Sequence, residues 1–268
     1  MNFNEGISMN ISGNTILVTG GGSGIGRRLA EEFQALGNTV IIAGRRQERL
    51  DETVAANPGM ISIVLDVSSH GAIRKFAATV VAEHPALNML INNAGIMKTE
   101  SLQAQQDDLA DAEAMITTNL LGPIRLTAAL LPHLGKQARS TIVNVTSGLA
   151  FVPLVVTPTY SATKAALHSY TLSLRRQLQG TAIEIIELIP PAVQTDLTPG
   201  QAVNPRYMPL AEYIAETMAL FQTTPTPSEI CVQRVNVLRR AEAEGRFDAA
   251  LDAVNPLPAA DVALPDTN

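Results

Sequence analysis

Two side chains capable of proton transfer, Tyr160 and Lys164, stand four residues apart. Residues with this separation lie on one face of an α-helix, so a helix over this segment brings the phenol and the ammonium group together. A free tyrosine has a pKa of about 10, and a nearby ammonium favours the phenolate and lowers that pKa. The pair therefore predicts a general acid or base near neutral pH, with Tyr160 giving the proton.

Ser147 precedes Tyr160 by thirteen residues and ends an apolar run typical of a strand. Its hydroxyl is able to donate a hydrogen bond to a substrate oxygen as negative charge develops there. A tyrosine and a lysine at this spacing are more often part of a solvated helix face. The three residue types in this order, after a glycine-rich loop, favour hydride transfer to a carbonyl or from an alcohol.

The segment ILVTGGGSGIG (16–26) leads from an apolar strand through glycines into a helix. Backbone N–H groups at such a helix N-terminus bind phosphate. The glycines at 20, 24 and 26 have the spacing G-x-x-x-G-x-G, and the G-x-G-x-x-G pattern fits in no register. We expect a dinucleotide to bind at this loop. The alternative is a glycine-rich turn without a ligand.

The end of the second expected strand bears on the choice of nicotinamide cofactor. An acidic residue there binds the ribose hydroxyl of NAD, but Gly44 stands in its place and Arg45 and Arg46 follow. Arginine side chains offer planar donors to a 2′-phosphate. NADP(H) is therefore favoured over NAD(H), with Arg45 as the better candidate. The alternative is that both arginines begin a solvated helix, since Ser23 adds no second cation in the glycine loop.

The elements that must position these residues alternate in type from residue 15 to residue 189. Apolar runs separate helix-length amphipathic stretches, which is the pattern of a parallel sheet covered on both faces. We predict strands at 15–19, 39–43, 61–66, 89–92, 141–147 and 183–189. We predict helices near 24–37, 46–56, 69–84, 107–133 and 160–179. The expected fold class is α/β, a single doubly wound (Rossmann) domain with a parallel sheet of six or seven strands.

The sequence changes character after Ile189. Residues 190–210 are rich in Pro, Thr and Gly, which predicts a substrate loop beside the active site. A helix near 209–222 and a second helix opening at Ser228 follow, and a seventh strand cannot be placed. We expect the single domain to span 1–254 and the tail, 255–268, to be extended or disordered.

The composition excludes several classes of function. The 268 residues are 46% hydrophobic and 16% charged, with a net charge of −6 and no basic run, which predicts no nucleic-acid partner. No apolar run reaches the length of a membrane helix and the N-terminus lacks signal-peptide features, so we expect a cytoplasmic protein without membrane contact. The lone Cys231 and four scattered histidines predict neither a disulfide nor a metal site.

Four motifs together resemble the short-chain dehydrogenase/reductase family over roughly residues 13–200: TGGGSGIG (19–26), NNAG (92–95), Asn119, and Ser147 with YSATK (160–164). The resemblance implies a catalytic set of Asn119, Ser147, Tyr160 and Lys164, with Asn119 holding a water relay. Together with the arginines it implies cofactor contacts from Gly20, Ser23, Gly24, Ile25, Gly26, Arg45, Arg46, Asp66, Val67, Asn93, Ala94, Gly95, Tyr160, Lys164, Val193 and Thr195. IPPAVQTDL (189–197) and the C-terminal sequence are similar to the subgroup of this family named after D-alanine transfer proteins.

One departure from the family pattern follows the sixth expected strand. The family's P-G-x-x-x-T reads PPAVQT (190–195), with Pro191 in place of the glycine. Proline fixes φ and lacks an N–H, so we expect this loop to bend differently. Val193 and Thr195 keep the places that face the nicotinamide carboxamide in the family.

We predict an NADP(H)-dependent carbonyl reductase or secondary alcohol dehydrogenase. Residues 148–159 are almost wholly apolar and carry no charge, so we expect them to wall the pocket and to favour a hydrophobic ketone. The alternatives are an NAD-dependent alcohol dehydrogenase and a non-catalytic NADP(H)-binding regulatory protein of the same fold. Helices 107–133 and 160–179 are candidates for the interface of a homodimer or homotetramer, with a dimer preferred if the seventh strand is missing.

Overall fold

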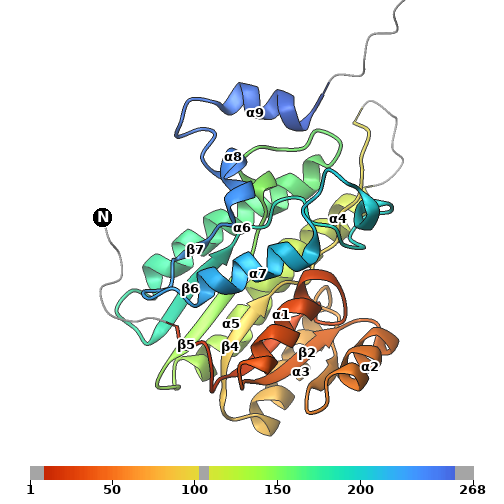
Figure 1. Cartoon of the computed structure of the whole chain (residues 1–268). Coiled ribbons are helices and arrows are strands. Elements are labelled where there is room, and N and C mark those ends of the chain that lie inside the picture. Colours follow the sequence, from red (N-terminus) through yellow and green to blue (C-terminus); the bar gives the residue numbers. More distant parts are fainter. Residues whose placement is uncertain (1–8, 103–108, 257–268) are drawn as a thin grey trace, which may run out of the picture.

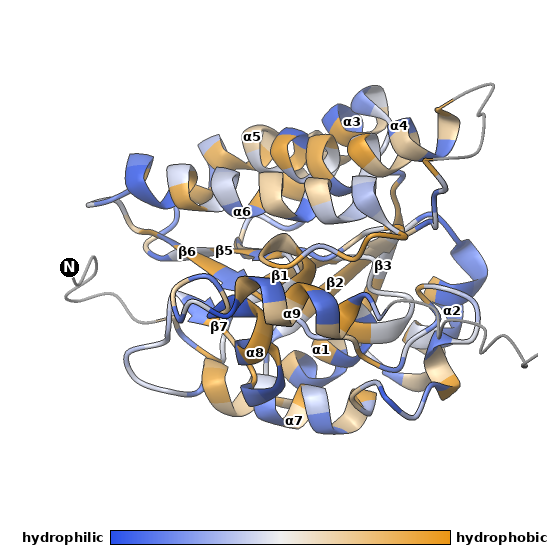
Figure 2. Ribbon diagram, turned by 90° about the horizontal axis from the view of Figure 1, so that it is seen from above, coloured by the Kyte–Doolittle hydropathy of each residue, from blue (hydrophilic) through white to orange (hydrophobic). Residues whose placement is uncertain are grey.

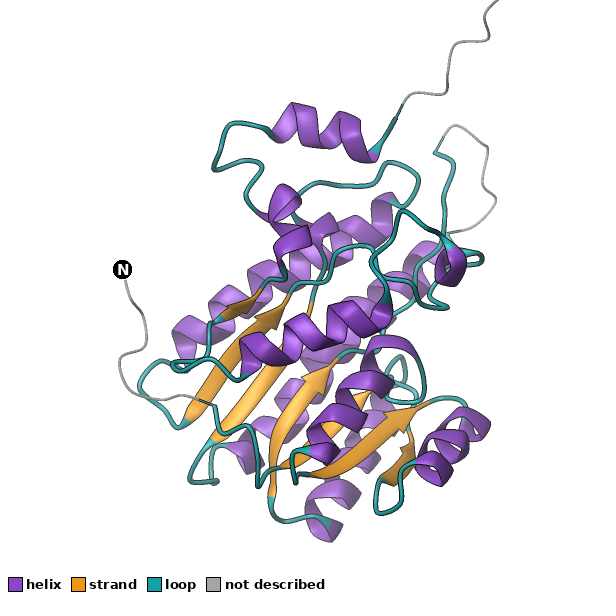
Figure 3. Ribbon diagram, in the orientation of Figure 1, coloured by secondary structure: helices purple, strands orange, loops and turns teal. Residues whose placement is uncertain are grey.

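A computed structural model describes residues 9–102 and 109–256 of the chain. A seven-stranded parallel sheet in the order β3-β2-β1-β4-β5-β6-β7 forms its centre (Figures 1 and 3). The strands are β1 (Thr15–Thr19), β2 (Thr39–Gly44), β3 (Ile61–Val64), β4 (Leu87–Asn92), β5 (Ser140–Val145), β6 (Ile183–Leu188) and β7 (Glu229–Ile230). The longer helices are α1 (Gly24–Ala35), α2 (Gln47–Ala56), α3 (His70–Glu83), α4 (Ala110–Ile116), α5 (Gly122–Leu134), α6 (Pro158–Gln177), α7 (Leu210–Phe221) and α9 (Phe247–Val254). The doubly wound α/β fold predicted from the sequence is confirmed.

Helices cover both faces of the sheet (Figure 2). One face packs against α1 and α7, where the rings of Phe33 and Phe221 meet edge to face with centroids 5.6 Å apart. The other face packs against α3, α5 and α6 through side chains such as Leu126 and Leu174. Because successive strand residues point to opposite faces, burial on both sides makes the strands continuous apolar runs, which is why they were recognisable in the sequence.

The strand order reverses beside β1, which pairs with β2 on one side and β4 on the other. In doubly wound sheets, ligands bind in the crevice outside the carboxyl ends of the strands at such a reversal. The glycine loop follows β1 and the NNAG motif follows β4, so the topology brings these two segments together.

The long helix predicted over 107–133 is not one continuous α-helix in the structure. Its first described helical residue is Ala110, and 107–108 lie outside the described residues. A π-helical turn over Thr117–Leu121 separates α4 from α5. By length and composition alone, the run Ala110–Leu134 qualifies as a candidate membrane span, with 44% of its most apolar window buried. Core helices pass the same test, and Leu126, Leu130 and Leu134 of this run are buried against the sheet side of the protein.

The helix predicted to open at Ser228 is wrong. The chain forms the seventh strand there, β7, whose residues pair with β6 as Glu187↔Glu229 and Leu188↔Ile230. Only two residues pair, too few to give the alternation that marks a strand. A 3₁₀ turn (Gln233–Val235) and the short helix α8 (Asn236–Arg239) follow. The dimer preference rested on a missing strand, so that argument no longer separates dimer from tetramer.

The C-terminal segment packs on the loop that precedes α6 (Figure 1). Val152 is buried with Ala241 and Ala250, which come from the segment after α8 and from α9. The Asn255 side chain donates to the Pro153 carbonyl at 3.0 Å and accepts from the Val155 N–H at 2.7 Å. The extended or disordered tail predicted from 255 onward therefore does not include Asn255, while 257–268 lie outside the described residues.

Candidate active site

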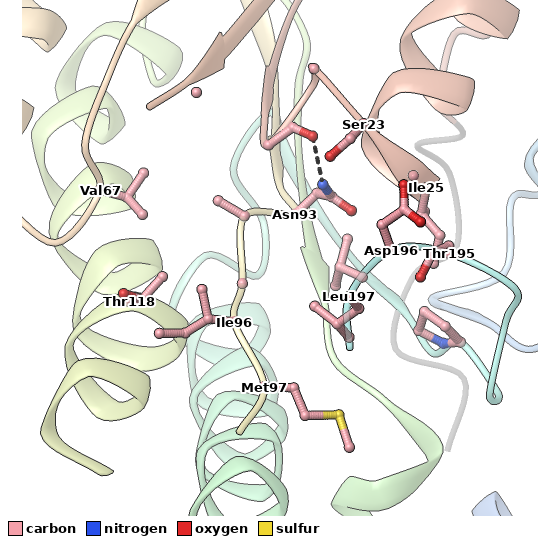
Figure 4. A pocket seen from close by; sticks show the side chains of 18 of the residues that line it. Ser23, Ile25, Val67, Asn93, Ile96, Met97, Thr118, Thr195, Asp196 and Leu197 are labelled. Atoms are coloured by element: carbon pink, nitrogen blue, oxygen red, sulfur yellow. Dashed lines mark hydrogen bonds between the residues drawn. The ribbon is translucent and has the colours of Figure 1, made fainter. Parts of the chain in front are cut away.

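A cavity of about 440 Å³ opens at the carboxyl ends of the strands (Figure 4). The glycine loop, the ends of β2, β4 and β5, the start of α6 and the loop after β6 contribute to its walls. Of the predicted site residues, Gly20, Ser23, Gly24, Ile25, Arg45, Arg46, Val67, Asn93, Ala94, Gly95, Ser147, Tyr160, Lys164, Val193 and Thr195 line it. Gly26, Asp66 and Asn119 do not.

The glycine loop leaves little room for side chains. A Cβ on Gly26 would lie 2.3 Å from the Asn93 Nδ2 and 2.5 Å from the Gly20 carbonyl oxygen, so Gly26 serves the close packing of α1 beneath the cavity. Gly24 has a φ of +54°, which side-chain-bearing residues rarely adopt. Ser23 precedes α1 without a side-chain capping bond, so N–H groups at the N-terminus of the helix stay available to a ligand.

Asn93 and Thr19 join the glycine loop to the NNAG segment. The Asn93 side chain points toward the loop (Figure 4) and donates to the Thr19 carbonyl at 2.9 Å. The Thr19 hydroxyl in turn accepts from the backbone N–H groups of Asn93 and Ala94 at 3.0 and 3.1 Å. Asn93 thus lines the cavity and also holds two of its walls in register.

Arginine side chains gather at the end of the cavity formed by β2 and α2. Arg45, Arg46 and Arg49 line it, and Arg46 donates to the Ser23 hydroxyl at 3.4 Å. Arg49 was not predicted, although it lies three residues after Arg46 and thus on the same helical face. Asp66 lies outside the cavity and accepts from the N–H and hydroxyl of Ser68.

The structure brings together the three residues predicted to be catalytic, Ser147, Tyr160 and Lys164. Tyr160 and Lys164 occupy successive turns of α6, and Ser147 follows the end of β5. All three are buried. The Lys164 Nζ donates to the Val145 carbonyl at 2.8 Å and lies 5.6 Å from the centroid of the Tyr160 ring. Ser147 Oγ accepts from the Leu149 N–H at 3.1 Å, and the Ser147 hydroxyl also forms a hydrogen bond with the Tyr160 phenol.

The pKa of Tyr160 moves in the direction opposite to our prediction. Burial raises it to about 12, and hydrogen bonding with Ser147 only partly counters this effect. Burial also lowers the pKa of Lys164 to about 8. The Lys164 ammonium donates to a backbone carbonyl and not to the phenol, so it does not offset the effect of burial on the tyrosine pKa. At neutral pH Tyr160 therefore carries its proton, as a general acid must.

Asn119 lies behind the catalytic residues, within the π-helical turn, and is fully buried. Its side chain accepts from the Ile96 N–H at 2.9 Å and donates to the Ile96 carbonyl at 2.8 Å. It also donates to the Thr163 hydroxyl at 3.3 Å. These bonds tie α6 to the segment after β4; the water relay implied for Asn119 stays a prediction.

Glu100 is a further residue near the site that the sequence did not single out. Its carboxylate accepts from the Thr159 N–H at 3.0 Å and from the Thr159 hydroxyl at 2.8 Å. Thr159 lies in the first turn of α6, where backbone N–H groups lack helical partners and favour negative charge. Glu100 therefore fixes the beginning of the helix immediately before Tyr160.

The loop after β6 closes back on itself around Gln201. Its side chain donates to the Val193 carbonyl at 2.8 Å and to the Thr195 hydroxyl at 3.1 Å. Val193 also forms a bridge with Met208. Despite Pro191, both Val193 and Thr195 line the cavity, and a Cβ on Gly24 would lie 3.5 Å from Thr195 Cγ2. The loop and the glycine loop therefore meet.

The apolar segment 148–159 does not line the cavity, so our prediction for this wall is wrong. The C-terminal segment takes up its apolar side chains: Val152 is buried in the small cluster described above, and Phe151 contacts Arg239. Apolar residues that do line the cavity include Ile96, Met97, Pro190, Pro191 and Leu197. Ile96 and Met97 directly follow the NNAG motif, which is the signal that could have identified them.

The residues of this cavity fit a phosphorylated dinucleotide. Backbone without Cβ atoms faces the cavity at Gly20, Gly22 and Gly24, next to the N-terminus of α1, and arginine side chains stand at the far end. Both features favour phosphate groups. Within residues 9–102 and 109–256, no cluster of histidine, cysteine and carboxylate side chains suited to a metal ion occurs.

Comparison with known proteins gives consistent matches. The family model for short chain dehydrogenases matches residues 14–204. The chain is 44% identical over 189 residues to an uncharacterized oxidoreductase, DltE, of Bacillus subtilis (strain 168), covering 70% of this chain and 75% of the relative. It is 34% identical over 176 residues to the NADP-dependent 3-hydroxy acid dehydrogenase YdfG of Shigella flexneri, covering 65% of this chain and 71% of that protein. A short-chain dehydrogenase from Streptomyces avermitilis superposes with a TM-score of 0.76 at 28% identity, covering 90% of this chain and 96% of that one.

Proposed function

Because this chain belongs to the short chain dehydrogenase family, we propose that it is an NADPH-dependent carbonyl reductase that also runs in reverse as a secondary alcohol dehydrogenase. The observation that carries the proposal is the buried Ser147, Tyr160 and Lys164 set at the carboxyl end of the sheet, inside a cavity suited to a dinucleotide. The nicotinamide supplies the hydride when it is bound.

Each residue of the set has a separate task in this proposal. Tyr160, protonated at neutral pH, donates its hydroxyl proton to the carbonyl oxygen as that oxygen gains charge. Ser147 donates a hydrogen bond to the same oxygen when the substrate is bound. Lys164 places a positive charge in a buried position, where it favours negative charge developing on the phenol.

The preference for NADP(H) over NAD(H) rests on Arg45, Arg46 and Arg49 at one end of the cavity. No carboxylate stands at the end of β2 to bind a ribose hydroxyl, since its last residue is Gly44. Guanidinium groups bind phosphate oxygens through paired hydrogen bonds. The relative YdfG is NADP-dependent by name, which agrees with this preference.

For the substrate we propose a ketone with apolar substituents. Met97, Pro191 and Leu197 line the cavity, and Leu197 keeps 37% of its surface exposed. Lys98 lines the cavity as well, so the substrate panel must include keto acids. If keto acids are reduced faster than neutral ketones, the proposed substrate class is wrong, while the proposed reaction, carbonyl reduction, still holds.

The test is NADPH oxidation measured against neutral ketones, diketones and keto acids, with Tyr160→Phe as the variant. We expect Tyr160→Phe to abolish ketone-dependent oxidation and to leave NADPH binding, measured by fluorescence titration, intact. Turnover by the variant would refute the assignment. NADPH binding without hydride transfer to any member of the panel would favour the regulatory protein, and a higher rate with NADH would favour the NAD-dependent enzyme.

We further propose a cytoplasmic homo-oligomer, a homodimer or a homotetramer, assembled through α4–α5 and α6. Ile116 and Leu172 support this interface, since they lie on these helices and remain 41% and 44% exposed. Sedimentation velocity of the wild type and of Leu172→Glu tests it. A monomeric wild type, or an unchanged assembly in the variant, would count against the proposal.

A further inference from the structure

A fully buried carboxylate lies beside the catalytic residues but outside the cavity. Glu187 of β6 has no exposed surface. Its Oε1 accepts a hydrogen bond from the Thr146 hydroxyl at 2.7 Å, and His168 Nδ1 lies 2.8 Å from Oε2 and 3.0 Å from Oε1. An ionised carboxylate only accepts hydrogen bonds, so the imidazole donates through Nδ1. Glu187 and His168 do not line the cavity, whereas Thr146 does.

Both partners of this carboxylate adjoin catalytic residues. Thr146 directly precedes Ser147, in the stretch where the chain has left β5. His168 lies one turn beyond Lys164 and two turns beyond Tyr160 on α6, so all three side chains share one helical face. Glu187 thus joins the segment that carries Ser147 to the helix that carries the other two catalytic residues.

The surroundings hold the imidazole and balance the buried charge. The ring of Phe151 meets that of His168 edge to face, with centroids 4.7 Å apart. The Arg239 guanidinium lies 4.6 Å from the centroid of Phe151 and forms a two-point ion pair with Glu229 at 2.8 and 2.9 Å. The charges of Arg175 and Arg239 both act on Glu187. A buried charge persists only when it is paired and hydrogen-bonded in this way.

We propose that Glu187, His168 and Thr146 form a positioning unit that fixes the Ser147 hydroxyl relative to Tyr160 and Lys164. This inference rests on the proposed function for its kinetic effect. Backbone bonds tie the same segment to β6 and to the residues just after it, from Thr146 N to the Leu188 carbonyl and from Gly148 N to the Pro190 carbonyl, both at 2.9 Å. The Glu187 carboxylate adds the link to α6. An error of about 1 Å in such a placement lowers a rate by about 100-fold.

The first test compares Thr146→Val with Thr171→Val. Thr171 is also fully buried between α6 and the sheet, donates to the Leu167 carbonyl at 2.7 Å and accepts from Asn144 Nδ2 at 2.9 Å. The two substitutions remove the same hydroxyl from the same layer. We expect similar losses of thermal stability, but a fall in kcat of about tenfold or more only for Thr146→Val, with NADPH affinity unchanged. Thr146→Ser should retain wild-type kcat within about threefold, because it keeps the hydroxyl.

A second pair of variants covers the case in which Thr146→Val fails to fold. The His168 side chain is 20% exposed, so its replacement is tolerated more readily than that of a core residue. His168→Asn keeps an N–H donor near Glu187, whereas His168→Leu removes it. We expect kcat to fall in the leucine variant and to recover in part in the asparagine variant. Equal kcat values in both would overturn the positioning role.

The third measurement needs no activity. Hydrogen exchange at the Leu149 amide reports the Ser147 turn, because this N–H donates to Ser147 Oγ. In the protein without cofactor we expect exchange at Leu149 to be about tenfold faster in Thr146→Val and unchanged in Thr171→Val. Equal protection in both variants overturns the inference. A wild type that reduces no ketone, with Leu149 exposed only in Thr146→Val, overturns the proposed function and keeps the positioning unit.

Discussion

Lys164 Nζ lies 2.8 Å from the carbonyl oxygen of Val145, two residues before Ser147. The ammonium group therefore holds the end of β5 against α6 while it stands behind the Tyr160 ring. A charged donor makes a stronger hydrogen bond than a neutral amine does. Loss of the Lys164 proton should thus weaken both the placement of β5 and the positive charge near the phenol.

We expect this loss to set the alkaline limb of the pH profile. Burial lowers the pKa of Lys164 from 10.5 to about 8, well below that of Tyr160. For ketone reduction, kcat/KM should fall as pH rises through about 8, because kcat/KM reports ionisations of the free enzyme. Lys164→Arg, whose guanidinium stays charged, should move the limb to higher pH. An identical limb in wild type and Lys164→Arg would assign it to another group.

Arg45→Ala should weaken NADPH binding selectively. A charged hydrogen bond contributes about 1.5 to 3 kcal/mol, so the Kd for NADPH should rise by about 10- to 100-fold while that for NADH stays nearly constant. Arg28→Ala is the matched control, because Arg28 is exposed, pairs with Glu31 and lies outside the cavity lining. Fluorescence titration with both cofactors measures the effect. Equal weakening for NADPH and NADH would remove Arg45 from 2′-phosphate recognition.

Gln201→Ala should loosen the loop after β6. The side chain bonds to Val193 and Thr195, and it accepts from the Thr198 hydroxyl at 2.8 Å. With these bonds removed, we expect the Kd for NADPH to rise by about five- to tenfold, equivalent to roughly 1 kcal/mol. Gln194→Ala provides the control, since Gln194 donates to the Asn204 carbonyl of the same loop at 2.9 Å without lining the cavity. Equal changes in the two variants would mean that loop stability alone decides affinity.

Glu184 should make stability depend on pH. It lies buried near the start of β6, and its Oε2 has no hydrogen-bond partner within the part of the chain that the structure describes. Burial raises its pKa from 4.5 to about 7, against the opposing charge of Arg139. The folded state therefore binds more protons than the unfolded state between these pH values, so this contribution to the free energy of unfolding is lost as pH rises through about 7.

Glu184→Gln tests that dependence by urea unfolding at pH 5 and pH 8. The variant should gain stability over wild type at pH 8, and most of this gain should disappear at pH 5. Glu52→Gln, at an exposed position of α2, serves as the control and should show no such difference. A gain of the same size at both pH values would contradict the assignment to a titrating carboxyl.

The sheet and the cofactor side of the site were predictable because their signals are local. The runs that became β1 to β6 are continuous and apolar, and the helices before residue 100, together with α6, end within two residues of their predicted limits. Glycine spacing, Arg45 and the Tyr160–Lys164 pair each mark their own place in the chain. The positions of these residues can be predicted without knowing how distant segments of the chain pack.

The predictions that failed depend on distant segments. Whether residues 148–159 face the cavity is decided by the C-terminal segment, which buries Val152 with Ala241 and Ala250. β7 exists because β6 offers an edge for Glu229 and Ile230 to pair with. The contribution of Glu187 is invisible in a single apolar strand, since its partners come from β5 and α6. These contacts are tertiary, and one residue's type and spacing do not encode them.

The π-helical turn at Thr117–Leu121 amounts to a one-residue insertion that the helix absorbs without ending. Each α-helical residue turns the chain by about 100°, so the residues before and after the turn are out of phase by about that angle. One helical segment therefore directs its side chains to two different partners. Asn119 contacts Ile96, and the leucines of α5 pack toward the sheet. Deleting a single residue between 117 and 121 would restore an even winding and turn one of these two sets away from its partners.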